Sequence, residues 1–93
     1  MSISLPEGTV DALSAGRAAF EAGHYADALH HFGVILNHDA DHPWAWHGRG
    51  DALQLMGSYQ EALAAYETAA ALQPEEPLHR AGIDNARRAL SEQ

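Results

Sequence analysis

The 93-residue sequence contains neither cysteine nor lysine. Without cysteine, the chain has no disulfide, no thiolate ligand for a metal and no cysteine nucleophile. Without lysine, five arginines are its only fixed cations against 13 acidic residues, and the formal net charge is −8. This balance disfavours nucleic acid and anionic membrane surfaces as partners, because both are negatively charged.

Long apolar runs are also missing. No window approaches the run of about 18 apolar residues that a membrane-spanning helix needs, and residues 1–10 lack the basic start and apolar stretch of a secretory signal. We therefore expect a cytoplasmic protein. Valine and isoleucine are few and alanine is abundant, which favours helices over strands. The length is that of one small domain.

What the sequence does contain is an internal repeat with an offset of 34 residues. The identical pairs include glycines and a tyrosine, which are informative in a chain so rich in alanine. They are Gly16/Gly50, Ala18/Ala52, Gly23/Gly57, Tyr25/Tyr59, Ala28/Ala62 and Leu29/Leu63, with Phe32/Tyr66 as a close match. The offset continues into Pro43/Pro77 and Gly48/Gly82. A fixed period of this length indicates stacked copies of one structural unit.

Each copy is predicted to be two helices separated by a glycine turn. Gly23 and Gly57 suit the left-handed residue that ends a helix, and Pro43 suits the first turn of the next one. Thr9 is the expected N-cap of the first helix, and Ser58 with Glu61 has the spacing of a capping box. The predicted helices run over Val10 to Ala22, Tyr25 to about Asn37, Pro43 to about Met56, Ser58 to about Leu72, and Leu78 to about Ser91.

This pattern resembles the tetratricopeptide repeat. The second copy supplies residues of the family pattern at Trp46, Gly50, Ala62, Tyr66 and Pro74, whereas the first copy has only the equivalents of Gly50, Ala62 and Tyr66. The resemblance implies an all-α fold of antiparallel helix pairs, stacked as a short right-handed α-solenoid of five helices, with Trp46 in the core. We expect a flexible segment (1–8), a degenerate repeat (9–42), a second repeat (43–76) and a capping helix (77–93).

The resemblance also implies a binding module whose first helices line a concave groove for a peptide or partner helix. The residues on that face are predicted from helical spacing: Leu13, Arg17, Phe20, Trp44, His47, Asp51, Asn85 and Arg88. Trp44 is not explained by the repeat; it either belongs to the groove or packs on the first repeat's loop or the N-terminal segment. A carboxylate-binding clamp is disfavoured, because Asp51 would repel the ligand. An apolar or basic segment is the expected partner.

Two other functions compete with an adaptor that binds such a partner. A self-assembling module is the first alternative, because two repeats are fewer than such stacks usually need. A metal- or pH-responsive module is the second, because residues 30–42 are rich in histidine and aspartate. The sequence has no phosphate-binding loop, nucleophile motif or zinc-protease motif, so we expect no enzyme, no cofactor and no dedicated metal site.

Overall fold

The computed structural model describes the backbone of residues 7–93 and the side chains of residues 12–93. This part of the chain forms five α-helices and no strand, packed one after another, which confirms the all-α helical repeat. The helices are α1 (Glu7–Glu21), α2 (Tyr25–His38), α3 (Pro43–Leu55), α4 (Tyr59–Leu72) and α5 (Pro77–Ser91). Most of the expected flexible segment 1–8 lies outside the described residues, but Glu7 and Gly8 belong to α1.

The first helix of each pair ends at a glycine in the left-handed conformation. Gly23 and Gly57 have φ angles of 84° and 83°, and no atom lies within 4 Å of the Cβ that a larger residue would add. The following amides close both turns in the same way: His24 donates to the Ala19 carbonyl at 2.8 Å and Ser58 to the Leu53 carbonyl at 2.9 Å. Backbone conformation, rather than space, therefore selects glycine at both positions.

The predicted N-cap at Thr9 and the predicted capping box at Ser58 are wrong. Thr9 lies inside α1, which begins two residues earlier at Glu7. Ser58 does occupy the N-cap of α4, but its side chain makes no capping hydrogen bond, so the capping box with Glu61 does not form. Side-chain caps occur instead before the two helices that begin with proline. Nδ1 of His42 accepts from the Ala45 amide at 3.1 Å, and Oε2 of Glu76 accepts from the Leu78 amide at 3.1 Å.

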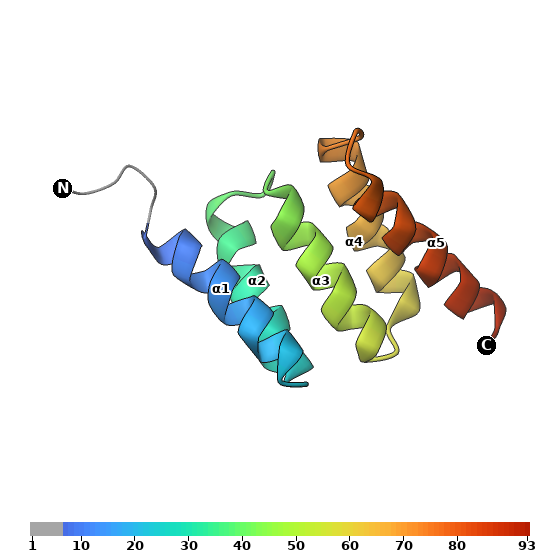
Figure 1. Cartoon of the computed structure of the whole chain (residues 1–93), viewed down its shortest axis with the longest axis horizontal. Coiled ribbons are helices and arrows are strands. Elements are labelled where there is room, and N and C mark those ends of the chain that lie inside the picture. The colour runs from blue at the N-terminus through green and yellow to red at the C-terminus, as the bar shows by residue number, and fades with distance from the viewer. Residues whose placement is uncertain (1–6) are drawn as a thin grey trace.

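The helices form two layers, with α1, α3 and α5 side by side in one and α2 and α4 in the other (Figure 1). Two aromatic rings from the second layer, Phe32 and Tyr66, lie between the helices of the first layer and set their spacing; we call them the aromatic spacers. A Cβ added to Gly16 or Gly48 would lie 2.7 Å or 2.5 Å from the Phe32 ring, so this ring fills the space between α1 and α3. The Tyr66 ring fills the equivalent space between α3 and α5.

The space around Tyr66 repeats that arrangement. A Cβ at Gly50 or Gly82 would lie 2.7 Å or 2.5 Å from the Tyr66 ring. The offset of 34 residues therefore records a packing unit: one aromatic ring held between a glycine of its own helix pair and a glycine of the next. A larger side chain at any of these four glycines would overpack the contact.

The core around these rings is built mainly from alanine. Six alanines have no exposed surface: Ala28, Ala45, Ala52, Ala62, Ala69 and Ala86. Trp46 does not belong to this core, contrary to expectation. It is only partly buried, because its indole Nε1–H donates to the Ala40 carbonyl at 2.7 Å and holds the ring against the connection between α2 and α3.

Candidate functional site

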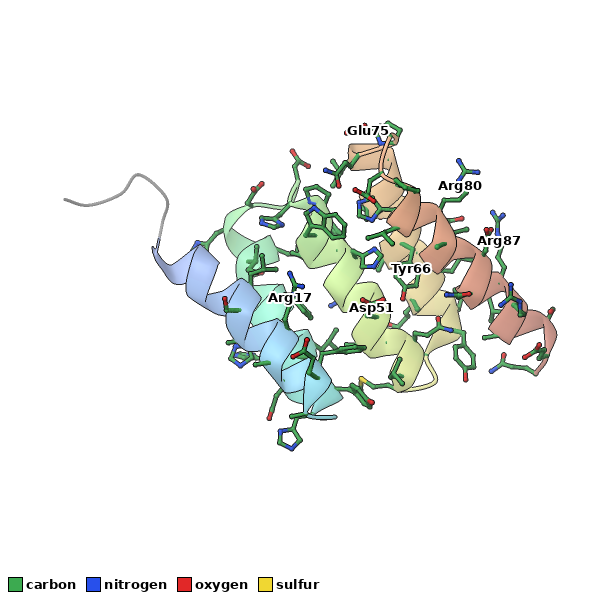
Figure 2. The ribbon with its side chains drawn as sticks, viewed as in Figure 1. Arg17, Asp51, Tyr66, Glu75, Arg80 and Arg87 are labelled. Atoms are coloured by element: carbon green, nitrogen blue, oxygen red, sulfur yellow. The ribbon has the colours of Figure 1, made fainter. Side chains whose placement is uncertain are left out.

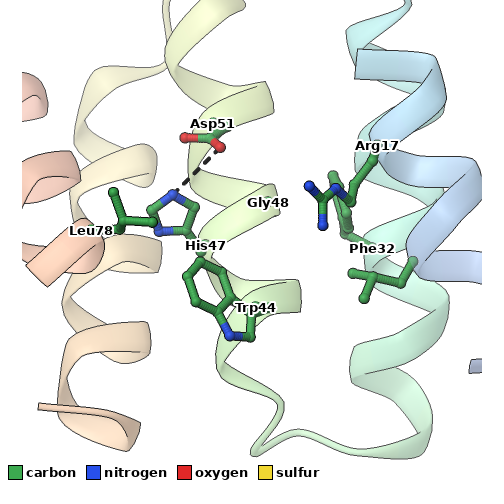
Figure 3. A pocket seen from close by; sticks show the side chains of 8 residues that line it. Arg17, Phe32, Trp44, His47, Gly48, Asp51 and Leu78 are labelled. Atoms are coloured by element: carbon green, nitrogen blue, oxygen red, sulfur yellow. Dashed lines mark ion pairs between the residues drawn. The ribbon is translucent and has the colours of Figure 1, made fainter. Parts of the chain in front are cut away.

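A pocket of about 240 Å³ opens on the layer formed by α1, α3 and α5 (Figure 3). It unites five of the eight predicted site residues from two separate helices: Leu13, Arg17, Trp44, His47 and Asp51. Phe32 and Gly48 complete its lining from the contact between α1 and α3, and Leu78 adds an apolar side chain from the start of α5. The predicted helix faces thus converge on one hollow.

The remaining three predicted residues do not line this pocket. The Phe20 ring packs instead on the Tyr25 ring, with centroids 5.5 Å apart across the turn at Gly23. Asn85 and Arg88 lie further along α5, where both are exposed and the Arg88 guanidinium approaches the Asn85 side-chain oxygen at 3.5 Å. Helical spacing therefore predicted more residues for the site than this pocket includes.

The Trp44 ring lies over two histidine rings. Its centroid is 5.3 Å from that of His47 and 4.8 Å from that of His79. Among the described side chains, its aromatic contacts are therefore to α3 and α5 and not to the connection that follows α2. The indole is partly exposed and forms one apolar wall of the pocket.

A chain of polar contacts runs beneath Trp44 and links three helices. Nε2 of His79 contacts Oε1 of Gln73 at 2.8 Å, and Nδ1 of His79 contacts Nδ1 of His47 at 2.9 Å. Nε2 of His47 lies 3.5 Å from Oδ2 of Asp51, and the Tyr66 hydroxyl donates to Oδ1 of Asp51 at 2.5 Å. These contacts run from Gln73, in the connection before α5, to Asp51 at the pocket, where Tyr66 joins them from α4. Together the contacts fix the orientation of His47 and Asp51.

Burial of these polar contacts shifts the pKa values of two of their residues, His79 and Tyr66. His79 has no exposed surface, and burial together with the charge of His47 lowers its pKa, an effect that Glu76 and Glu75 partly offset. Burial, with the hydrogen bond and charge of Asp51, raises the pKa of the Tyr66 hydroxyl far above its usual range. Neutral His79 and un-ionised Tyr66 therefore flank His47 and Asp51.

The pocket carries one formal charge of each sign on opposite helices. Arg17 extends from α1 towards α3, and Asp51 lies on α3 (Figures 2 and 3). Among the side chains of residues 12–93, no carboxylate lies within 4.0 Å of the Arg17 guanidinium. Within these residues Arg17 has no ion-pair partner, whereas Asp51 is shared with Tyr66 and His47.

His79, Tyr66 and Gln73 were not predicted as part of the site. For His79, the repeat does contain a signal, because the offset of 34 residues makes it the equivalent of Ala45, which has no exposed surface. A histidine at a position equivalent to a buried alanine is unusual, because a buried imidazole needs hydrogen-bond partners. The partner Gln73 lies in an irregular connection, where helical spacing predicts nothing.

The histidine-rich stretch 30–42 has structural contacts. The His30 and His31 rings meet edge to face at 5.6 Å, His42 caps α3, and Oδ1 of Asp39 accepts from the Asp41 amide at 3.1 Å. Over the described residues, no three histidine or acidic side chains are grouped as metal ligands. Nor is any described helix both long and apolar enough to cross a membrane.

Comparison with known proteins agrees with this architecture. No curated protein matches the chain significantly. A family model described as "Tetratricopeptide repeat" matches residues 19–83, which extend from the last turn of α1 to the middle of α5. The match includes both glycine turns and both aromatic spacers, and it covers well over half of the sequence. The chain therefore belongs to the tetratricopeptide repeat family.

Proposed function

We propose that the chain is a non-enzymatic adaptor that binds an extended segment of a partner protein in the pocket between α1, α3 and α5. Tetratricopeptide repeats generally mediate protein–protein interaction. The observation that carries the proposal is that a partly exposed indole, two leucines and one charge of each sign line a single pocket. Tryptophan and arginine are also enriched among residues that dominate binding energy.

The chemistry of the pocket favours an apolar side chain flanked by polar main chain. Leu13, Trp44 and Leu78 offer apolar surface, while Arg17 can donate to a peptide carbonyl and Asp51 can accept from a peptide amide or a cation. The acidic character of the whole chain, with a net charge of −8, attracts basic segments over longer distances. The partner segment is therefore apolar with basic flanks.

Fluorescence polarisation with two labelled synthetic peptides tests this function. One peptide alternates leucine with arginine, and the other alternates leucine with glutamate. The basic peptide is expected to bind, and Trp44→Ala is expected to weaken it by about tenfold or more, as for a residue that dominates an interface. Leu55→Ala is the control, because Leu55 is exposed and lies outside the pocket. Equal losses in the two variants would contradict the proposed site.

Charge variants provide a second comparison. Asp51→Asn should weaken binding of the basic peptide, whereas Glu67→Gln should not, because Glu67 lies on α4 in an exposed pair with Arg87 at 3.7 Å. Both substitutions remove one negative charge, so the net charge of the protein changes equally. A difference between them therefore reports on the pocket and not on general attraction.

Self-assembly is the second candidate function, and one observation favours it. Leu55 and Met56, at the end of α3, are 53% and 47% exposed, so two neighbouring large apolar side chains face solvent together. The outer side of α5 argues against association through that edge, because it presents Arg80 and Arg87 (Figure 2). Solution mass over a concentration series separates the candidates: a dimer abolished by Leu55→Ser would support assembly, and a monomer throughout would exclude it.

A further inference from the structure

The contact between His47 and His79 limits how many protons the two rings hold. Only one proton fits between their Nδ1 atoms, which lie 2.9 Å apart. Oε1 of Gln73 is an acceptor, so the proton on the other side of His79 resides on Nε2. Two imidazolium rings would point two N–H groups at each other. The pair therefore carries at most one positive charge.

That charge has a defined place. With Nε2 of His79 protonated, its Nδ1 is a bare acceptor and receives the hydrogen bond from Nδ1–H of His47. A second proton on His47 then occupies Nε2, where it faces Oδ2 of Asp51 at 3.5 Å. Without this proton, the Nε2 lone pair faces the carboxylate and the two groups do not attract each other. The geometry thus accepts one proton, at the atom next to Asp51.

The groups around the pair define its electrostatic setting. Asp51 belongs to α3 itself, the un-ionised Tyr66 approaches from α4, and Arg17 lies across the pocket on α1. Glu75 and Glu76, in the connection before α5, favour positive charge on His79 and oppose the effect of its burial. Because His79 is fully buried while His47 borders the pocket, the added charge resides on His47.

We propose that uptake of one proton by the His47–His79 pair neutralises Asp51 and thereby lowers the affinity of the pocket for a basic segment. This regulation rests on the proposed function. With the pair neutral, Arg17 and Asp51 balance each other, and Asp51 can accept from a cationic ligand. With the pair protonated, His47 and Asp51 form an internal ion pair and Arg17 remains as the uncompensated charge. The pocket then favours an anionic segment over a basic one.

The proton count can be measured on the full chain without any partner. Nitrogen-15 spectra of the imidazole rings would be recorded over about pH 8 to 5, the range in which histidine ordinarily titrates. His47 and His79 are expected to take up one proton between them, at Nε2 of His47, with Nε2 of His79 protonated throughout. Uptake of two protons by this pair in the folded protein, or of none, would overturn the proposal.

The consequence for binding is tested with the two synthetic peptides described above. Between about pH 7.5 and 5.5, affinity for the arginine-containing peptide is expected to fall by about fivefold or more, the lower end of typical coupling between two binding events. In His47→Gln and in Asp51→Asn this pH dependence should be lost. His24→Gln, which replaces an exposed histidine outside the pocket, should retain it.

The outcomes separate the two proposals. If the basic peptide binds with the same affinity at both pH values, the regulation is wrong and the adaptor function stands. If neither peptide binds at either pH, the adaptor function is wrong and the regulation falls with it, whatever the proton count. His47→Gln keeps a donor for Nδ1 of His79, so the fold of the buried pair is expected to survive the substitution.

Discussion

The Tyr66 hydroxyl donates a hydrogen bond of 2.5 Å to Oδ1 of Asp51. The ring of the same tyrosine separates α3 from α5, with glycines on both sides. One residue therefore sets the spacing of two helices and also holds a carboxylate at the edge of the pocket (Figure 2). The Tyr66 side chain thus contributes both to helix packing and to the site.

Tyr66→Phe separates these two roles, because it keeps the ring and removes the hydroxyl. We expect the free energy of unfolding to fall by about 1–2 kcal/mol, since Asp51 loses a donor while remaining partly exposed to water. Urea denaturation measures the change. Tyr59→Phe is the matched control, because the Tyr59 hydroxyl has no hydrogen-bond partner among the described residues. Equal stability of Tyr66→Phe and the wild type would show that the hydrogen bond contributes nothing.

Gly48→Ala tests the packing of the aromatic spacers. The added Cβ would lie 2.5 Å from the Phe32 ring, between the α3 backbone and a fully enclosed side chain. Overpacking of this kind should cost roughly 1–3 kcal/mol. Gly33→Ala makes the same chemical change in α2 with no atom within 4 Å of the new Cβ, and should stabilise the helix by about 0.5–1 kcal/mol. Thermal midpoints that move in the same direction would contradict this account.

His42→Ala removes the side chain that caps α3. Loss of an N-cap typically costs about 0.5–2 kcal/mol, and the Ala45 amide loses its acceptor here. His38→Ala is the control, because His38 is exposed at the end of α2 and caps no helix. Urea midpoints of the two variants measure the difference. If both substitutions have the same effect, the hydrogen bond from His42 is not what stabilises the start of α3.

Stability should also decrease as the pH falls below neutrality. Burial lowers the pKa of His79 in the folded state, whereas an unfolded histidine binds a proton near pH 6.5. Below that pH the unfolded chain therefore binds more protons than the folded one. The free energy of unfolding then falls by up to about 1.4 kcal/mol per pH unit for one such group. The stabilisation is complete above about pH 6.5 and disappears as the pH approaches the lowered pKa of His79.

Urea unfolding at several pH values measures this dependence. His79→Gln should be less stable than the wild type near neutrality but should show a shallower decline towards acidic pH. His24→Gln should retain the decline of the wild type, because that side chain is exposed and makes no capping hydrogen bond. Parallel curves for His79→Gln and the wild type would show that His79 is not the source.

Much of the fold could be predicted because its signals are local. Glycine at a left-handed position and proline in a first turn mark helix ends directly, so the predicted ends of four helices agree with the structure to within two residues. The start of α1 was the exception, since Thr9 suits an N-cap but α1 extends beyond it. Propensity indicates where a cap is favourable, and neighbouring turns decide whether the helix continues.

The site was predictable only as a set of helix faces. Helical spacing aligned Leu13 and Arg17 with Trp44, His47 and Asp51, because these residues lie along two neighbouring helices. It could not show that Phe20 turns towards Tyr25, since that contact depends on how the chain reverses at Gly23. Contacts that require three helices and an irregular connection, as for His79 and Gln73, follow from tertiary packing alone.

The position of α5 has a consequence for the dynamics of the pocket. Among the described helices, α5 packs on α4 and more lightly on α3, so it can open locally while the contacts between α1 and α2 stay intact. His79 and Leu78 both belong to α5, while Tyr66 packs against it. Fraying of this helix would release His47 and uncover Tyr66 while α1 and α2 remain paired. Amide hydrogen exchange in α5 should accordingly report on opening of the pocket, so that binding competence can be lost before the fold is.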